Sequence, residues 1–116
     1  MARYLDEQQA AADGFSIVHE PEEQRYTIYQ SESASTGQHE RAGRGRLVGE
    51  AHYSLIGERT IDFDHTVVLP ELRGTGLAGL LAHHALTGDA IGTRQLHASC
   101  WFIDGYLTRH PELRER

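Results

Sequence analysis

The fold of this 116-residue chain is decided by the stretch Val68-Leu69-Pro70-Glu71-Leu72-Arg73-Gly74-Thr75-Gly76-Leu77-Ala78. Apolar and β-branched residues in 61–68 precede it and predict a strand. Apolar side chains follow at helical spacing, at Leu77, Leu80, Leu81, Ala85 and Leu86. The first turn of a helix carries unpaired N–H groups, and glycines let a ligand approach the backbone closely. The stretch therefore predicts an anion site, most often for phosphate.

The remainder of the chain predicts an α+β fold built on one mixed sheet. Patterns of alternating and β-branched residues predict five strands, at 15–19, 25–30, 46–55, 60–68 and 95–99. One main helix follows the fourth strand, and a short C-terminal helix begins near Trp101 and is ended by Pro111. A right-handed crossover would place the fifth strand beside the fourth and parallel to it.

Residues 14–113 are expected to form a single domain, which is the number that this chain length favours. Residues 1–13 read as a polar, partly ordered lead-in, and residues 114–116 as a charged tail. Residues 31–45 contain much Ser and Gly and no large apolar side chain, which predicts a flexible insertion.

The composition excludes several classes of function. The net charge is −6, so the chain is a poor nucleic-acid binder. All eleven basic residues are Arg, which excludes a Schiff-base lysine and a Walker-type phosphate lysine. No apolar run approaches the ~20 residues that a membrane span needs. Histidines at zinc-ligand spacing to a cysteine are absent, so no metal site is predicted. The single cysteine favours a reduced, cytoplasmic setting.

The run Val68–Ala78 resembles the acetyl-CoA pyrophosphate motif of the GNAT superfamily of N-acetyltransferases, in which Arg/Gln-x-x-Gly-x-Gly/Ala follows a splayed strand. Two further segments narrow the resemblance, namely Phe63–Val68 with its His-Thr-x-Val pattern, and Ser99–Pro111 with its cysteine and its Arg-His-Pro ending. Together they look like the small, single-domain GNAT-like proteins. The resemblance extends from Phe15 to Leu113 and implies a GNAT-like fold with acetyl-CoA or coenzyme A as cofactor.

The resemblance also implies how the cofactor is held. Backbone amides of the turn would bind the pyrophosphate, with the Arg73 side chain at the phosphates; the residues concerned are Arg73, Gly74, Thr75, Gly76, Leu77 and Ala78. A bulged end of the fourth strand would pair with pantetheine through Val67, Val68 and Leu69. One N–H group of that strand would polarise the acetyl carbonyl, as in an oxyanion hole.

Two residues are candidates for catalysis, and each has a structural alternative. Cys100 is expected where the fifth strand ends, either as an acetyl acceptor or as a small buried side chain packed near the cofactor. His65 is expected to serve as general base or as a hydrogen-bonded strand residue, with Asp64 on the opposite face. Glu50 and His52 share one face of the third strand and are weaker candidates for the base. Aromatic residues 101, 102 and 106 read as core packing.

These observations predict an acetyl-CoA-dependent N-acetyltransferase acting on an amine that the sequence does not identify. The alternative is an acyl-CoA-binding module with little or no turnover, and a third, weaker one is a phosphate-binding interaction domain. The acidic composition favours a basic acceptor, such as a polyamine or a Lys-rich peptide. The chain is expected to be a monomer or a weak dimer that binds neither nucleic acid nor membrane.

Overall fold

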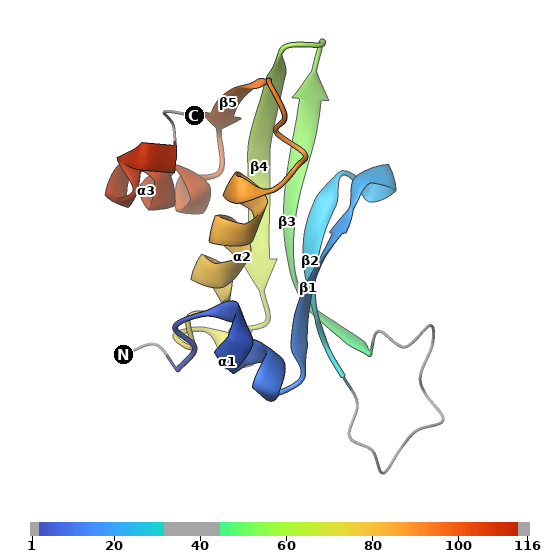
Figure 1. The fold of residues 1–116 in the computed structure, drawn as a ribbon, viewed down its shortest axis with the longest axis vertical. Helices are drawn as coiled ribbons and strands as arrows, with labels where there is room; N and C mark the ends of the chain where they lie inside the picture. The colour runs from blue at the N-terminus through green and yellow to red at the C-terminus, as the bar shows by residue number, and fades with distance from the viewer. Residues whose placement is uncertain (1–2, 32–44, 114–116) are drawn as a thin grey trace.

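A five-stranded sheet with strand order β1-β2-β3-β4-β5 forms the frame of the computed structural model, which describes residues 3–31 and 45–113 (Figure 1). The strands are β1 (Phe15–Glu20), β2 (Arg25–Gln30), β3 (Arg46–Ile56), β4 (Thr60–Val68) and β5 (Gln95–Ala98). The helices are α1 (Glu7–Ala12), α2 (Leu77–Thr87) and α3 (Trp101–Arg109). Short 3-10 turns occupy Pro21–Glu23, Pro70–Leu72 and Pro111–Leu113. The tail 114–116 and all but the first and last residues of the predicted insertion lie outside the described residues.

The sheet is antiparallel from β1 to β4, and β5 runs parallel to β4. The predicted α+β architecture is thus confirmed, including the parallel fifth strand after a helical crossover. Gly57 supports the tight β3–β4 connection with a φ of 62°, a conformation that favours glycine.

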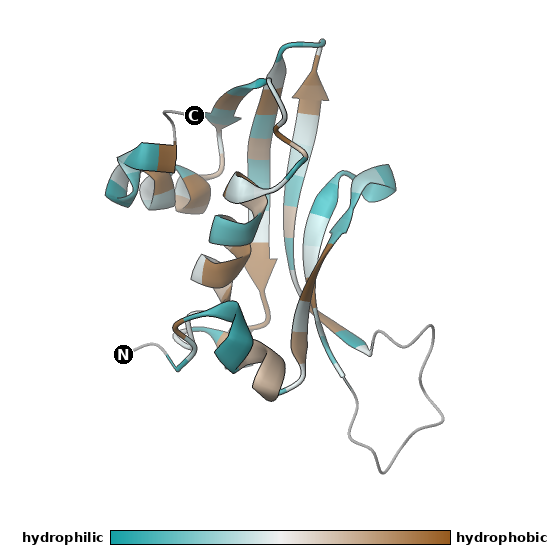
Figure 2. Ribbon diagram, in the orientation of Figure 1, coloured by the Kyte–Doolittle hydropathy of each residue, from teal (hydrophilic) through white to brown (hydrophobic). Residues whose placement is uncertain are grey.

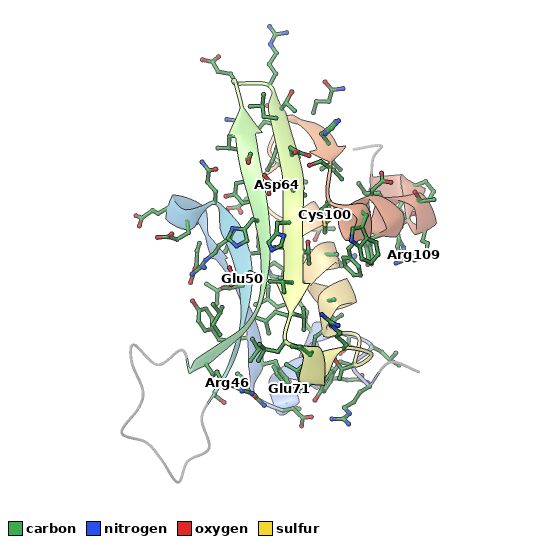
Figure 3. All side chains as sticks on the ribbon, turned by 180° about the vertical axis from the view of Figure 1, so that it is seen from behind. Arg46, Glu50, Asp64, Glu71, Cys100 and Arg109 are labelled. Carbon is green, nitrogen blue, oxygen red and sulfur yellow. The ribbon has the colours of Figure 1, made fainter. Side chains whose placement is uncertain are left out.

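Within residues 3–31 and 45–113, the three helices lie on one face of the sheet and the opposite face carries no helix (Figures 1 and 3). The core forms between the sheet and α2, whose predicted apolar positions Leu77, Leu81, Ala85 and Leu86 are buried. Ile28, Ile61 and Phe63 meet them from the strands and have no exposed surface. Figure 2 shows the same division, with hydrophobic residues along α2 and the strands behind it.

The lead-in packs on the domain through α1. The Asp6 side chain caps this helix by accepting a hydrogen bond from the N–H of Gln9 at 2.8 Å. Tyr4 and Ala10 are buried in the core. None of the helices within the described ranges is long and apolar enough to cross a bilayer.

A β-bulge in β4 changes the faces that its side chains occupy. Residue Asp64 has no partner in the register, because His65 opposes His52 while Phe63 opposes Tyr53. The prediction that Asp64 and His65 point to opposite faces is therefore wrong, since both contact residues of one face of β3. The predicted position of the bulge, Val67–Leu69, is also wrong; Val67 and Val68 pair regularly with β3.

Candidate functional site

The second half of β4 has an open edge because β5 leaves it. The parallel ladder ends at the pair Phe63–Ala98, and the N–H of Cys100 then donates to the carbonyl of Phe63 at 3.0 Å. The chain turns there into α3. Among the described residues, the strand neighbour of 64–68 is therefore β3 alone.

This open edge presents backbone groups to the space beside it. The N–H of Leu69 donates to the carbonyl of Val48 on β3 at 3.0 Å. Backbone direction alternates along an antiparallel strand, so the N–H groups of Thr66 and Val68 point away from β3. They face the gap that β5 leaves. The edge can therefore donate hydrogen bonds to an extended ligand.

The turn between β4 and α2 leaves a second set of donors. Four N–H groups here are paired internally: Leu72 donates to the carbonyl of Leu69, Arg73 to that of Pro70, Thr75 to that of Leu72, and Leu77 to the hydroxyl of Thr75. The intervening N–H groups of Gly74 and Gly76, and that of Ala78 directly after Leu77, have no acceptor among the described residues. These N–H groups lie at the N-terminal end of α2, where the helix dipole favours an anion.

Positive backbone angles make this turn possible. Gly74 has a φ of 81° and Gly76 a φ of 97°, a region in which side chains with a Cβ are strained. Gly76 is the residue that precedes the helix. A Cβ at Gly74 would meet no atom within 4 Å, so the space beside this glycine is open. The turn thus exposes its backbone to a ligand.

The open edge and the turn border one cavity of about 650 Å³. Its lining comprises Thr66, Val67, Val68, Leu72, Arg73, Gly74, Gly76, Ala78, Gly79, Trp101, Phe102, Tyr106 and Arg109. Six of the nine residues proposed for cofactor binding from the sequence are in this set. The other three are Leu69, Thr75 and Leu77. Thr75 and Leu77 are buried, and the Thr75 hydroxyl donates to the carbonyl of Leu72 at 2.6 Å. These two residues therefore stabilise the conformation of the turn.

The third wall of the cavity is α3, which the sequence analysis did not include. Phe102, Tyr106 and Arg109 are spaced by four and three residues and so form one stripe of the helix. The spacing alone does not distinguish a stripe that lines a cavity from one that packs on a core. Trp101 is 83% exposed, so the expectation that it packs in the core is wrong. Ile103 and Leu107 are the buried residues of α3.

The cavity has a positive rim. Arg73 is exposed and has no carboxylate partner within the described ranges. The guanidinium of Arg109 lies 5.9 Å from the centre of the Tyr106 ring. Burial raises the pKa of Tyr106 above its usual value, although the nearby Arg109 acts in the opposite direction. The phenol therefore stays neutral near pH 7 and can donate a hydrogen bond, but it cannot serve as a base.

Cys100 lies directly behind the cavity wall. It is the residue that precedes α3, and it is 8% exposed. Its thiol donates a hydrogen bond to the hydroxyl of Thr66 at 3.5 Å. Thr66 lines the cavity, whereas Cys100 does not. Figure 3 shows Cys100 at the junction of β5 and α3.

The structure separates His65 from this cavity. His65 is exposed on the helix-free face, where its ring centre is 6.0 Å from that of His52. His65 directly precedes Thr66, and Cys100 contacts the Thr66 hydroxyl. The two candidates for catalysis, His65 and Cys100, therefore lie on opposite sides of the open strand edge. Among residues 3–31 and 45–113, no group of three or more potential ligands could hold a metal ion.

Comparisons with known proteins show which proteins the chain resembles. A family model described as GCN5-related N-acetyl-transferase matches residues 38–116. The chain is also similar to Protein NATD1 of vertebrates: it is 36% identical over 59 residues to the protein from Homo sapiens and 32% identical over 66 residues to that from Danio rerio. The first match covers 51% of this chain and 52% of the relative, and the second 55% and 60%. The chain thus spans little more than half the length of these relatives.

Among solved structures, the chain resembles the NMR solution structure of a GCN5-like protein from Staphylococcus aureus. The TM-score is 0.50 at 21% sequence identity, and the likeness covers 87% of this chain and 85% of the other. At this identity the likeness supports the fold.

Proposed function

The chain belongs to the GCN5-related N-acetyl-transferase family, and from this premise we propose that it binds acetyl-CoA and transfers the acetyl group to an amine. The observation that carries the proposal is the cavity that joins the open edge of β4 to the glycine-rich turn. The strand edge supplies N–H donors at one end of the cavity, and the turn supplies them at the other. A long ligand with amide groups at one end and phosphates at the other matches this arrangement.

The turn supplies the phosphate end of the site. The N–H groups of Gly74, Gly76 and Ala78 would bind the pyrophosphate of coenzyme A, because they lack acceptors among the described residues and lie at a helix N-terminus. Arg73 would add a charged donor at the rim, since it has no carboxylate partner there.

The open strand edge supplies the thioester end. Backbone groups of Thr66 and Val68 would pair with the pantetheine amides, as an added strand does. One of these two N–H groups would also hold the acetyl carbonyl oxygen and stabilise the charge that develops on it. Bound acetyl-CoA supplies the activated acyl group.

For the reaction, we favour direct attack by the acceptor amine over transfer through Cys100. The thiol lies behind Thr66 and outside the cavity lining, where it can hold the Thr66 hydroxyl in place. His65 would accept the proton from the amine at the far side of the edge. The acidic chain favours a cationic amine as acceptor, and the cytoplasmic setting and the monomer or weak dimer stay predictions.

A second function, acyl-CoA binding with little turnover, is favoured by one observation. The ionisable residues in the cavity lining are Arg73, Tyr106 and Arg109, and none of them can act as a base at neutral pH. Any base must therefore come from outside the lining.

One assay separates the two functions. Purified protein is incubated with acetyl-CoA and either spermidine or a Lys-rich peptide, while free thiol release and acetylated amine are measured together. An N-acetyltransferase produces both in equal amounts, and Arg73→Ala lowers the rate whereas Arg59→Ala, at the exposed β3–β4 turn, does not. Saturable acetyl-CoA binding without either product would favour the binding module.

A further inference from the structure

A chain of polar contacts crosses the helix-free face of the sheet from β1 to β3. The guanidinium of Arg25 donates to Glu20 at 2.7 Å and to Glu50 at 3.1 Å. The Tyr29 hydroxyl donates to the second oxygen of Glu20 at 2.6 Å. Arg25 and Glu50 are 23% and 24% exposed, so that this charged pair is held in place rather than freely solvated. The contacts fix Glu50 on β3.

The chain ends at two histidines. The carboxylate of Glu50 lies 2.6 Å from Nε2 of His52. His52 and His65 are directly opposed across β3 and β4, with ring centres 6.0 Å apart. Beside them, the Ser54 hydroxyl donates to Asp64 at 2.6 Å. The bulge at Asp64 places His65 on this face.

The tautomer of His52 follows from its partner. A carboxylate accepts hydrogen bonds and does not donate them, so Nε2 of His52 carries the proton that Glu50 receives. The other nitrogen, Nδ1, is then the basic one in neutral His52. In this tautomer, Nδ1 of His52 can accept a proton from a neighbouring group.

His65 is next to the cavity along the chain. Thr66, Val67 and Val68 follow it, and all three line the cavity. Side chains of successive strand residues alternate between faces, so a cavity that reaches all three extends to the strand edge itself. His65 thus stands where the helix-free face meets the open edge of β4.

We propose that Glu50 fixes His52 opposite His65, and that Glu50 and His52 are positioning residues that draw away the proton His65 takes from the acceptor amine. This inference rests on the proposed function and deepens it. The acceptor approaches over the helix-free face, and its nitrogen reaches the acyl group at the edge of β4. The charged groups that face the histidines are Arg25 from β2, Glu50 from β3 and Asp64 from β4.

The proposed acetyl transfer conserves atoms and protons. An ammonium acceptor first gives one proton to water. Its neutral nitrogen then forms a C–N bond with the acetyl carbon, and the C–S bond breaks. The nitrogen proton passes to His65 and on to Nδ1 of His52, which returns it to solvent. The sulfur that leaves takes up a proton from water, so the products are the amide, coenzyme A and one proton overall.

The test compares variants of the full chain with acetyl-CoA and spermidine. Glu50→Gln and His52→Gln should each lower kcat about tenfold and leave the KM for acetyl-CoA unchanged. The double variant should lose no more than either single one, because the two residues act as a unit. Glu50→Asp should restore part of the rate.

The control is Glu58→Gln, which removes an exposed carboxylate from the turn between the same two strands. It should leave kcat and the pH profile unchanged. Thermal unfolding of each variant separates loss of the fold from loss of rate. A structural role alone would lower the unfolding temperature and would not leave the KM for acetyl-CoA unchanged while kcat falls.

Imidazole NMR signals provide a measurement that does not require turnover. Spermidine added to the coenzyme A-bound protein should shift the signals of His65 and His52, and Glu50→Gln should change both. If acetyl-CoA binds and either those signals do not move or the Glu50 and His52 variants behave like Glu58→Gln, the inference is wrong while the cofactor site stands. If acetyl-CoA does not bind at all, the proposed function itself fails.

Discussion

The thiol of Cys100 donates a hydrogen bond to the hydroxyl of Thr66 at 3.5 Å, across the point where β5 separates from β4. The contact joins the residue that precedes α3 to the residue that lines the cavity from the strand edge. Cys100 thus contacts a residue of the cavity lining without belonging to the lining itself.

The position of Cys100 leads to a prediction about covalent chemistry. Wild-type protein incubated with acetyl-CoA should show no added acetyl group in an intact mass spectrum. Cys100→Ala should keep acetyl transfer within about threefold of wild type, and should lose about 1 kcal/mol of stability because a small buried side chain is removed. An acetyl adduct that disappears in Cys100→Ala, together with loss of activity, would establish the covalent route instead.

Arg73 should contribute to affinity through charge. Arg73→Ala should weaken coenzyme A binding by about ten- to a hundredfold, because hydrogen bonds to charged groups contribute about 1.5–3 kcal/mol. The loss should shrink at high salt, since Arg73 is exposed and its charge is screened. Calorimetric titration measures both effects. Arg59→Ala is the matched control, and equal weakening in that variant would point to a general charge effect.

Two glycines should respond in opposite ways to the same substitution. Gly74→Ala should cost about 1–2 kcal/mol, because the φ of 81° is strained for a residue with a Cβ. Gly105→Ala should add about 0.5–1 kcal/mol, because Gly105 lies inside α3 and its Cβ would meet only Arg109 at 3.7 Å. Chemical denaturation measures both free energies of unfolding. Equal effects of the two changes would mean that the turn has another conformation.

Much of the fold could be predicted because its signals are local. The spacing of Leu77, Leu81 and Leu86 fixes the buried face of α2, and the crossover rule then orients β5. The bulge at Asp64 could not be predicted, because a bulge depends on how β3 pairs with β4. Its consequence, His65 sharing a face with His52, was missed for the same reason.

The site was predicted where its residues form one contiguous motif and missed where they come from elsewhere. Positions from Arg73 to Ala78 carry glycines and a charge in sequence. The stripe of Phe102, Tyr106 and Arg109 has the ordinary pattern of a helix that packs on a core. The stripe lines a cavity because β5 separates from β4 and leaves space between β4 and α3. This separation depends on tertiary structure and has no local signal in the sequence.

Asp62 should make stability depend on pH. It accepts hydrogen bonds from the N–H and hydroxyl of Ser99 at 2.8 and 2.7 Å and lies 3.1 Å from His97 Nδ1. Burial acts to raise the pKa of this carboxyl, but the hydrogen bonds from Ser99 and His97 outweigh burial and hold the pKa below its usual value. A lowered pKa means stability that is present above the unfolded-state value of about 3.9 and lost as pH falls through the folded-state value.

Asp62→Asn should therefore lower the free energy of unfolding by about 1–2 kcal/mol at pH 7. The difference from wild type should shrink as the pH falls below about 4, where wild-type Asp62 becomes protonated. Urea unfolding across this pH range measures it. A difference that stays constant with pH would show that the carboxylate charge contributes nothing.

If the open edge of β4 and the turn after it together form the acetyl-CoA site, the ligand should perturb the backbone amides of both, and amide NMR measures this directly. Acetyl-CoA is titrated into ¹⁵N-labelled protein and the shift of each amide is followed. We predict saturable shifts that concentrate at residues 66–78 and along the cavity side of α3, with little change at the β3–β4 turn near Gly57. Shifts that avoid residues 66–78, or no shifts at millimolar acetyl-CoA, would contradict the account.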